Sequence, residues 1–146
     1  MPGAQDLLDQ LTDDDALTAF LGAWRAGTLP KVAWTHAAHV AVCAAEAWPD
    51  EPLEALAARM KAGILAYNTA VGTANTPTSG YHETLTWFWC ERVLAHRDAH
   101  PQATRLAAVR RAVEAYGEAR GLHAASFDFD VVRDATARAV RVRPKA

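Results

Sequence analysis

The sequence predicts an all-α fold, a single-domain bundle of about five helices over residues 1–146. Residue types that favour helices, above all alanine with leucine, arginine and glutamate, are abundant. The alternation of β-branched and polar residues that is typical of strands is scarce. Glycine and proline fall in clusters that divide the chain into segments of helical length. A chain that is 51% hydrophobic and 22% charged can bury the core that such a bundle needs.

Capping residues mark the first two predicted helices. The aspartates at 13–15 can cap a helix whose apolar residues recur at helical spacing, and the glycine and proline at 27–30 end it. The stretch 29–34 indicates an extended link. Thr35 suits the N-cap of a second helix, which we expect over 36–48.

The second half of the chain is divided in the same way. Pro52 fits the first turn of a third helix, which runs to Tyr67. The polar stretch 68–80 follows, and such long loops are uncommon in compact domains unless they have a function. The remaining predicted helices span 82–96, 101–120 and, as a short element, about 130–140.

Charge and composition disfavour several functional classes. A net charge of −2 argues against wholesale binding of nucleic acid, which a basic domain favours. No apolar run approaches the roughly 18 residues that a membrane span needs, and the start of the chain is polar and acidic rather than a secretory signal. We therefore expect a soluble cytoplasmic protein without nucleic-acid or membrane partners, in which Cys43 and Cys90 are reduced thiols.

Two histidines, His36 and His39, form the strongest chemical pattern. Three residues apart on a helix, they lie about 60° apart, on one face and one turn from each other. A pair at this spacing that faces inward can supply two metal ligands, as in helical-bundle metal proteins. The alternative is structural: His36 would begin a solvated helix, and His39 would be a core histidine bonded to a backbone carbonyl.

A third histidine, His82, follows the polar stretch, with Glu83 beside it. A neutral imidazole suits a helix start, because the local field lowers its pKa, so we expect His82 to be a metal ligand or a catalytic base. Glu83 is the expected fourth ligand or general base, although the helix dipole alone also favours a carboxylate in a first turn.

Cys43 and Cys90 are better explained as inert core thiols than as further ligands. The other histidines are assigned to the surface: His96, His100 and His123.

Hydrogen-bonding side chains gather along the polar stretch and at its borders. Tyr67 and Asn68 close the third predicted helix. Asn75 and Tyr81 lie in the connection, and Thr86 follows in the next helix. We expect these five residues to orient a small polar substrate. Stabilisation of the loop by its own Asx and Ser/Thr turns is the alternative.

Three motifs occur in order: W-T-H-x-A-H at 34–39, Y-N-x-x-x-G at 67–72 and G-Y-H-E-T-x-T at 80–86. Together they resemble an uncharacterised bacterial all-helical family. The resemblance implies that the three histidines, Glu83 and the polar residues around them belong together, and it implies no particular activity. The C-terminal segment departs from the family pattern, because Val140 stands where a tryptophan is expected.

The leading functional hypothesis is a metal-dependent enzyme that acts on a small polar molecule. His36, His39 and His82 would bind one divalent transition metal (zinc, iron, copper or nickel), since neutral imidazoles suit these ions. The second hypothesis is a metal-free pocket, in which the same histidines bind a small molecule or act as acid and base. The third is a purely structural or interaction module. The sequence leaves open whether the chain forms a homo-oligomer.

Overall fold

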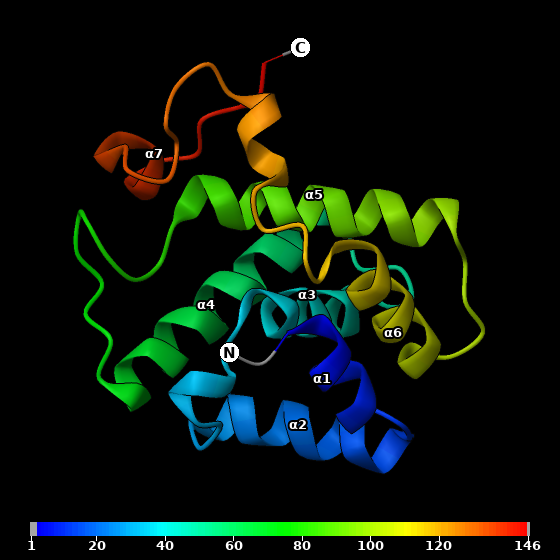
Figure 1. Ribbon diagram of the computed structural model, residues 1–146. Helices are drawn as coiled ribbons and strands as arrows, with labels where there is room; N and C mark the ends of the chain where they lie inside the picture. The colour runs from blue at the N-terminus through cyan, green and yellow to red at the C-terminus, as the bar shows by residue number, and fades with distance from the viewer. Residues whose placement is uncertain (1–2, 146) are drawn as a thin grey trace.

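The computed structural model describes residues 3–145 as seven α-helices and two 3-10 helices (Figure 1). The first α-helices are α1 (Ala4–Gln10), α2 (Asp14–Ala26) and α3 (His36–Ala47). The others are α4 (Leu53–Val71), α5 (Glu83–Ala99), α6 (Arg105–Tyr116) and α7 (Ala135–Ala139). The 3-10 helices are η1 (Lys31–Ala33) and η2 (Leu122–Ser126). The described residues contain no β-strand, which confirms the all-α prediction, whereas the predicted number of helices is too low.

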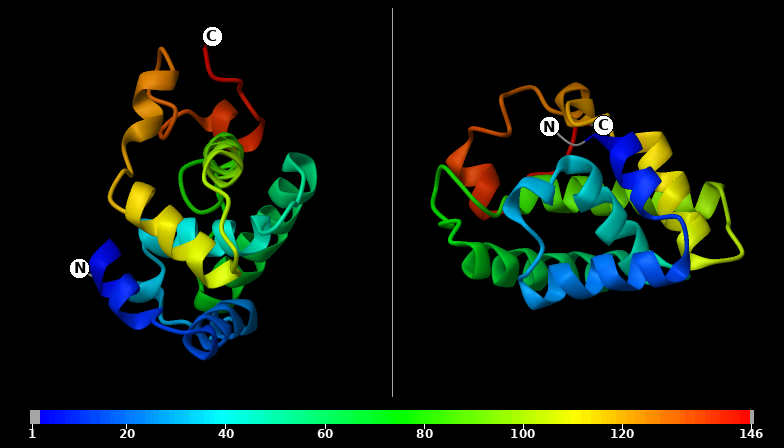
Figure 2. Two further views of the ribbon diagram at one scale, coloured as in Figure 1. Left: turned by 90° about the vertical axis from the view of Figure 1, so that its right-hand side faces the viewer. Right: turned by 60° about the horizontal axis from the view of Figure 1, so that its bottom comes forward.

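Helix α3 is the centre of the fold. Nine of its 12 residues are buried, and most of these are alanines. Small side chains let neighbouring helices approach closely, so α3 packs against α1, α4, α5 and α6. Figure 1 shows α3 between α5 above and α2 below, and Figure 2 shows α4 and α6 on either side of it. The main core therefore forms around one alanine-rich helix.

Side-chain caps confirm the predicted helix starts in the first half of the chain. The Asp13 carboxylate accepts a hydrogen bond from the N–H of Ala16 (2.8 Å), and the Thr35 hydroxyl accepts one from the N–H of Ala38 (3.2 Å). Gly27 ends α2 with a φ of 73°, a left-handed conformation that favours glycine.

Several predicted boundaries differ from the structure. Helix α5 runs to Ala99 rather than 96, and α6 ends at Tyr116 rather than about 120. The expected extended link contains η1, because the N–H of Ala33 donates to the Pro30 carbonyl (2.8 Å). Helix α4 continues beyond the predicted end to Val71, so the polar loop is shorter than expected. Helix α6 begins at Arg105 instead of the predicted 101, because the Thr104 side chain caps it.

The sequence pattern does not predict α1, whose start depends on a distant residue. The Gly3 N–H donates to the Asp6 carboxylate (2.7 Å), and the Ala4 N–H donates to the Glu118 carboxylate (2.6 Å). Glu118 lies 114 residues away along the chain. A local pattern cannot show such a cap.

The C-terminal segment, residues 127–142, covers the start of α5 (Figure 1). Its small core contains Phe88, Phe127, Val131 and Ala137. The buried Thr84 hydroxyl donates to the Val140 carbonyl (3.0 Å) and accepts from the Val142 N–H (2.9 Å). The predicted short helix is present in this segment only as α7, shorter than expected.

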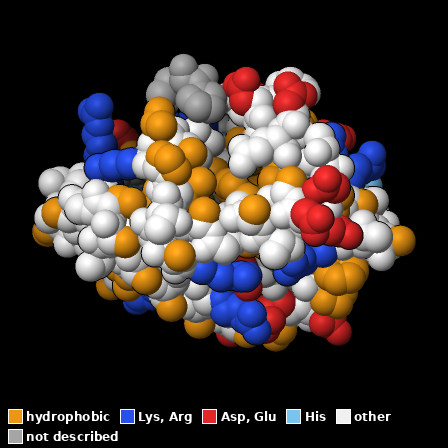
Figure 3. Space-filling model, turned by 90° about the horizontal axis from the view of Figure 1, so that it is seen from below, with side chains coloured by type: hydrophobic (Ala, Val, Ile, Leu, Met, Phe, Trp, Pro, Cys, Tyr) orange, Lys and Arg blue, Asp and Glu red, His pale blue; other side chains and the backbone are white. Residues whose placement is uncertain are grey.

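Charged side chains of both signs are interspersed among polar and hydrophobic ones on the face shown in Figure 3. Within residues 3–145, none of the helices combines the length and the apolar character that crossing a bilayer requires.

Two helical glycines provide a matched test of the packing around Trp24. A Cβ added to Gly63 in α4 would lie 2.2 Å from Cη2 of Trp24, whereas one added to Gly22 in α2 would have no neighbouring atom within 4 Å. We expect Gly22→Ala to raise the free energy of unfolding by about 0.5–1 kcal/mol, because alanine favours helices. Gly63→Ala should lower it by about 1–3 kcal/mol, because the buried indole has to move. Urea denaturation measures both changes, and equal midpoints for the two variants would contradict the described packing.

Candidate functional site

His36 and His39 lie one turn apart on α3, as predicted, and each is held by a backbone carbonyl. The Nε2–H of His36 donates to the Tyr116 carbonyl (3.1 Å), and the Nδ1–H of His39 donates to the Thr35 carbonyl (2.8 Å). Since a carbonyl oxygen only accepts, each bond fixes which ring nitrogen carries the proton. The lone pair of the neutral ring is then on Nδ1 of His36 and on Nε2 of His39. Neither nitrogen has a hydrogen-bond partner among the described residues.

Tryptophan rings flank both imidazoles. Trp34 stacks on His39 with a centroid separation of 3.7 Å, and Trp89 of α5 meets the His36 ring edge at 4.6 Å. Trp34 stacks in turn on the buried Trp24 at 5.3 Å. The two histidines and the two flanking tryptophans are half-buried. We call His36, His39, Trp34 and Trp89 the histidine–tryptophan cluster.

Burial keeps both imidazoles of this cluster uncharged at neutral pH. It lowers the pKa of His39 to about 4, although the hydrogen bond to the Thr35 carbonyl acts in the opposite direction. Burial also lowers the pKa of His36, against the effect of its bond to the Tyr116 carbonyl. Both rings therefore present a lone pair rather than a second N–H.

His82, the predicted third member, has both ring nitrogens engaged. It is the N-cap of α5, where its Nδ1 accepts a hydrogen bond from the N–H of Leu85 (3.2 Å). Its Nε2–H donates to the Val131 carbonyl (2.8 Å). His82 is buried, and burial lowers its pKa. In this arrangement it has no free nitrogen for a metal or a substrate.

Glu83 lies in the first turn of α5, where it accepts a hydrogen bond from the Tyr81 hydroxyl (2.6 Å). The ammonium group of Lys61 is 3.8 Å from its other carboxylate oxygen. Burial, and then the bond to Glu83, raise the pKa of Tyr81 above its usual value. Tyr81, predicted as a substrate ligand, thus pairs with the predicted catalytic carboxylate.

The other predicted substrate ligands contact the chain itself. The buried Tyr67 hydroxyl donates to the Leu29 carbonyl (2.8 Å), and the Thr86 hydroxyl donates to the His82 carbonyl (2.8 Å). The Asn75 side-chain oxygen accepts from the Asn68 amide (3.0 Å) and from the Tyr81 N–H (2.9 Å). Asn75 therefore stabilises the polar loop through its own hydrogen bonds, as the alternative to substrate binding supposes.

No group of three or more His, Cys, Asp or Glu side chains within residues 3–145 is arranged to hold a metal ion. Cys43 and Cys90 are buried free thiols whose sulfur atoms lie 4.0 Å apart, between α3 and α5. The hydrogen bond with Cys90, followed by burial, raises the pKa of the Cys43 thiol. Such thiols are weak nucleophiles and weak ligands.

Two of the histidines assigned to the surface, His96 and His100, line a groove together with Trp48 and Arg111. Their rings lie 4.7 Å apart. His100 follows α5 as its C-cap, beyond the predicted end of that helix at 96, and the groove also requires the end of α3, so the sequence does not place the two rings together. The third, His123, is half-buried, and its Nδ1 lies 3.1 Å from the Arg120 carbonyl.

Comparisons with models of known protein families, with curated proteins and with solved structures find no match to this chain.

The low pKa of His39 predicts an acid-sensitive contribution to stability. In the unfolded chain His39 takes up a proton as the pH falls through about 6.5, whereas the folded protein resists protonation until about pH 4. The unfolded state then binds more protons, so the free energy of unfolding should fall across this interval, by up to about 3 kcal/mol. His39→Asn, which keeps an N–H near the position of Nδ1, should remove this contribution. Urea denaturation of both proteins from pH 7 to pH 4 measures it, and parallel curves would contradict the assignment.

Proposed function

We propose that the chain binds a small polar molecule at the histidine–tryptophan cluster, with neutral His36 and His39 as hydrogen-bond acceptors and without a metal ion. One observation carries the proposal: each imidazole gives its N–H to a backbone carbonyl and leaves its lone pair without a partner. A ligand that donates two hydrogen bonds, such as a diol or an amide, would satisfy both nitrogens.

The surroundings of the pair favour a flat ligand. Trp34 and Trp89 supply aromatic surface on either side of the imidazoles. After burial and the carbonyl hydrogen bond, charges of both signs act on His36: that of Arg120 lowers its pKa and that of Glu118 raises it.

The two histidines have different roles in this proposal. A general base works best when its pKa is close to the operating pH. His39, with a pKa of about 4, therefore positions the ligand, and we assign any proton transfer to His36. His82 supports the fold by capping α5, and Glu83 holds Tyr81.

Resorcinol and its dimethyl ether form a matched pair of probes for the acceptor pair. Resorcinol has two hydroxyl donors on a flat ring, and the ether has the ring without the donors. In buffer that contains a chelator, resorcinol should shift the Cε1–H resonances of His36 and His39 in NMR spectra, and the ether should not. His36→Ala and His39→Ala should each weaken resorcinol binding about fivefold to tenfold, the value of one hydrogen bond.

His100→Ala, a histidine substitution outside the cluster, serves as the control and should leave resorcinol binding unchanged. Equal binding of resorcinol and its ether, or equal loss in all three variants, would overturn the proposal.

A metal-dependent site is the second candidate, and one feature of the pair favours it. Histidines that ligate metals almost always donate their other ring N–H to a carbonyl, a carboxylate or a water, as both His36 and His39 do. Of the three predicted histidine ligands, His36 and His39 would bind the metal, since both nitrogens of His82 are engaged. The remaining positions of the metal would be filled by water or substrate.

Zinc titration followed by thermal denaturation separates the two candidates. If the pair binds a metal, zinc should raise the melting temperature, and a chelator should reverse the increase. When each variant is compared with its own zinc-free protein, the increase should be absent in His36→Ala and His39→Ala and present in His82→Ala. An unchanged melting temperature with zinc would eliminate the metal site and would not affect the proposal of a metal-free site at the histidine–tryptophan cluster.

A further inference from the structure

A groove lies where the C-terminal ends of α3 and α5 meet α6. Its outer part has a volume of about 250 Å³ and is open to solvent. Its inner part has room for about 20 Å³, enough for one water-sized group. The two parts share the side chains of Trp48, Arg97 and Gln102, so the groove narrows from a broad mouth to a small inner end.

Cationic groups dominate the lining of this groove. His96, Arg97, His100 and Arg111 line it, and Asp98 is the acidic side chain among its described lining residues. The Asp98 carboxylate already pairs with Nε of Arg97 at 3.0 Å. The inner part itself is lined by no carboxylate.

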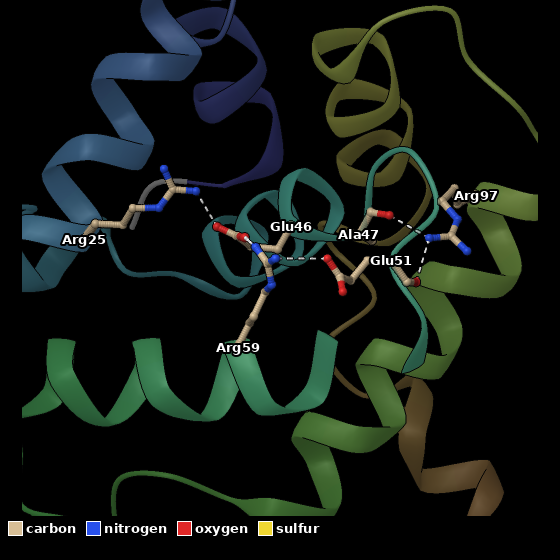
Figure 4. Close-up of polar contacts among 6 residues, drawn as sticks. All are labelled: Arg25, Glu46, Ala47, Glu51, Arg59 and Arg97. Carbon is tan, nitrogen blue, oxygen red and sulfur yellow. Dashed lines mark hydrogen bonds and ion pairs between the residues drawn. The ribbon is translucent and has the colours of Figure 1, made fainter. Parts of the chain in front are cut away.

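Arg97 is fixed in place by backbone carbonyls. Its Nη1 donates to the carbonyls of Ala47 (2.6 Å) and Glu51 (3.0 Å), and its side chain is only 17% exposed (Figure 4). Nη2 of Arg97 has no hydrogen-bond partner among residues 3–145. The guanidinium is therefore held rigidly while two of its N–H groups stay uncommitted.

The nearby glutamates do not neutralise Arg97, because other arginines bind them. Figure 4 shows Arg25 and Arg59 at Glu46, and Arg59 also at Glu51. Arg59 lies 3.2 Å from a carboxylate oxygen of each glutamate. The carboxylate partner of Arg97 among the described residues is therefore Asp98, whose side chain is exposed, and not either glutamate.

The remaining cationic groups lack partners. The rings of His96 and His100 and the guanidinium of Arg111 make no hydrogen bond or ion pair within the described part of the chain. Burial, and then the charges of His100 and Arg111, lower the pKa of His96, which also packs against the Tyr116 ring at 5.4 Å. Asp98 therefore pairs with Arg97, whereas Arg111, His96 and His100 have no carboxylate partner among the described residues.

We propose that the groove binds a small carboxylate, one oxygen of which enters the inner part while its flat body lies against Trp48 in the outer part. The fork of a guanidinium matches a carboxylate, and charge-assisted hydrogen bonds would satisfy the free N–H groups of Arg97 and Arg111. A carboxylate is favoured over a phosphate, because the inner part accommodates about one oxygen-sized group. The site is independent of the function proposed for the histidine–tryptophan cluster.

Benzoate, with neutral benzamide as its matched control, tests this proposal by NMR titration of the intact protein. Benzoate should shift the Trp48 indole N–H and the Cε1–H resonances of His96 and His100, and benzamide should not. Arg111→Gln should weaken benzoate binding about tenfold, the value of a charge-assisted hydrogen bond. Arg133→Gln, the same change at a side chain that is 88% exposed and outside the groove, should have no effect. Binding should tighten as the pH falls from 8 to 6, because a bound anion favours the protonated form of His96, whose pKa burial and the neighbouring charges lower.

Three results would each overturn the proposal: equal binding of benzamide and benzoate, equal affinity of Arg111→Gln and Arg133→Gln, or benzoate shifts confined to residues outside the groove. Shifts confined to His36 and His39 would place benzoate at the histidine–tryptophan cluster instead, and would leave the function proposed there untouched.

Discussion

The close packing of other helices on α3 is the constraint on which the rest of the structure depends. Alanine fills most of the buried surface of this helix, so α1, α4, α5 and α6 can all reach it. A larger residue at any of these alanines would overpack the core, because protein interiors are close-packed. The core around α3 thus depends on small side chains.

This arrangement separates the two candidate sites. The histidine pair belongs to the first turns of α3, and Trp48 follows its last residue. Twelve residues of helix span about 18 Å, so His36 and Trp48 lie at opposite ends of α3. Tyr116 contacts both sites, because its carbonyl accepts from His36 and its ring packs against His96 at 5.4 Å. Backbone carbonyls hold the two histidines at one end and Arg97 at the other. Rigid helices position side chains more accurately than loops do.

The sequence predicts those features that depend on neighbours along the chain. The caps at Asp13 and Thr35 and the shared face of His36 and His39 follow from local geometry, and all are present. The carbonyl bond of His39 belongs to the structural alternative that the sequence left open beside a metal ligand. The missed features depend on distant contacts. Glu118 caps α1 from 114 residues away, and the Val131 carbonyl that holds His82 lies 49 residues from it. The groove was missed for the same reason, because its lining comes from three helices.

The attachment of residues 127–142 to α5 has a consequence for the third histidine. This segment has its own small core and is tied to the start of α5 through Thr84 and His82. Such a unit can open locally at a lower free energy than the main core. Opening would break the bond between His82 and the Val131 carbonyl and free Nε2 of the imidazole. The accessibility of His82 to solvent, metal or ligand is therefore set by a local folding equilibrium of the C-terminal segment.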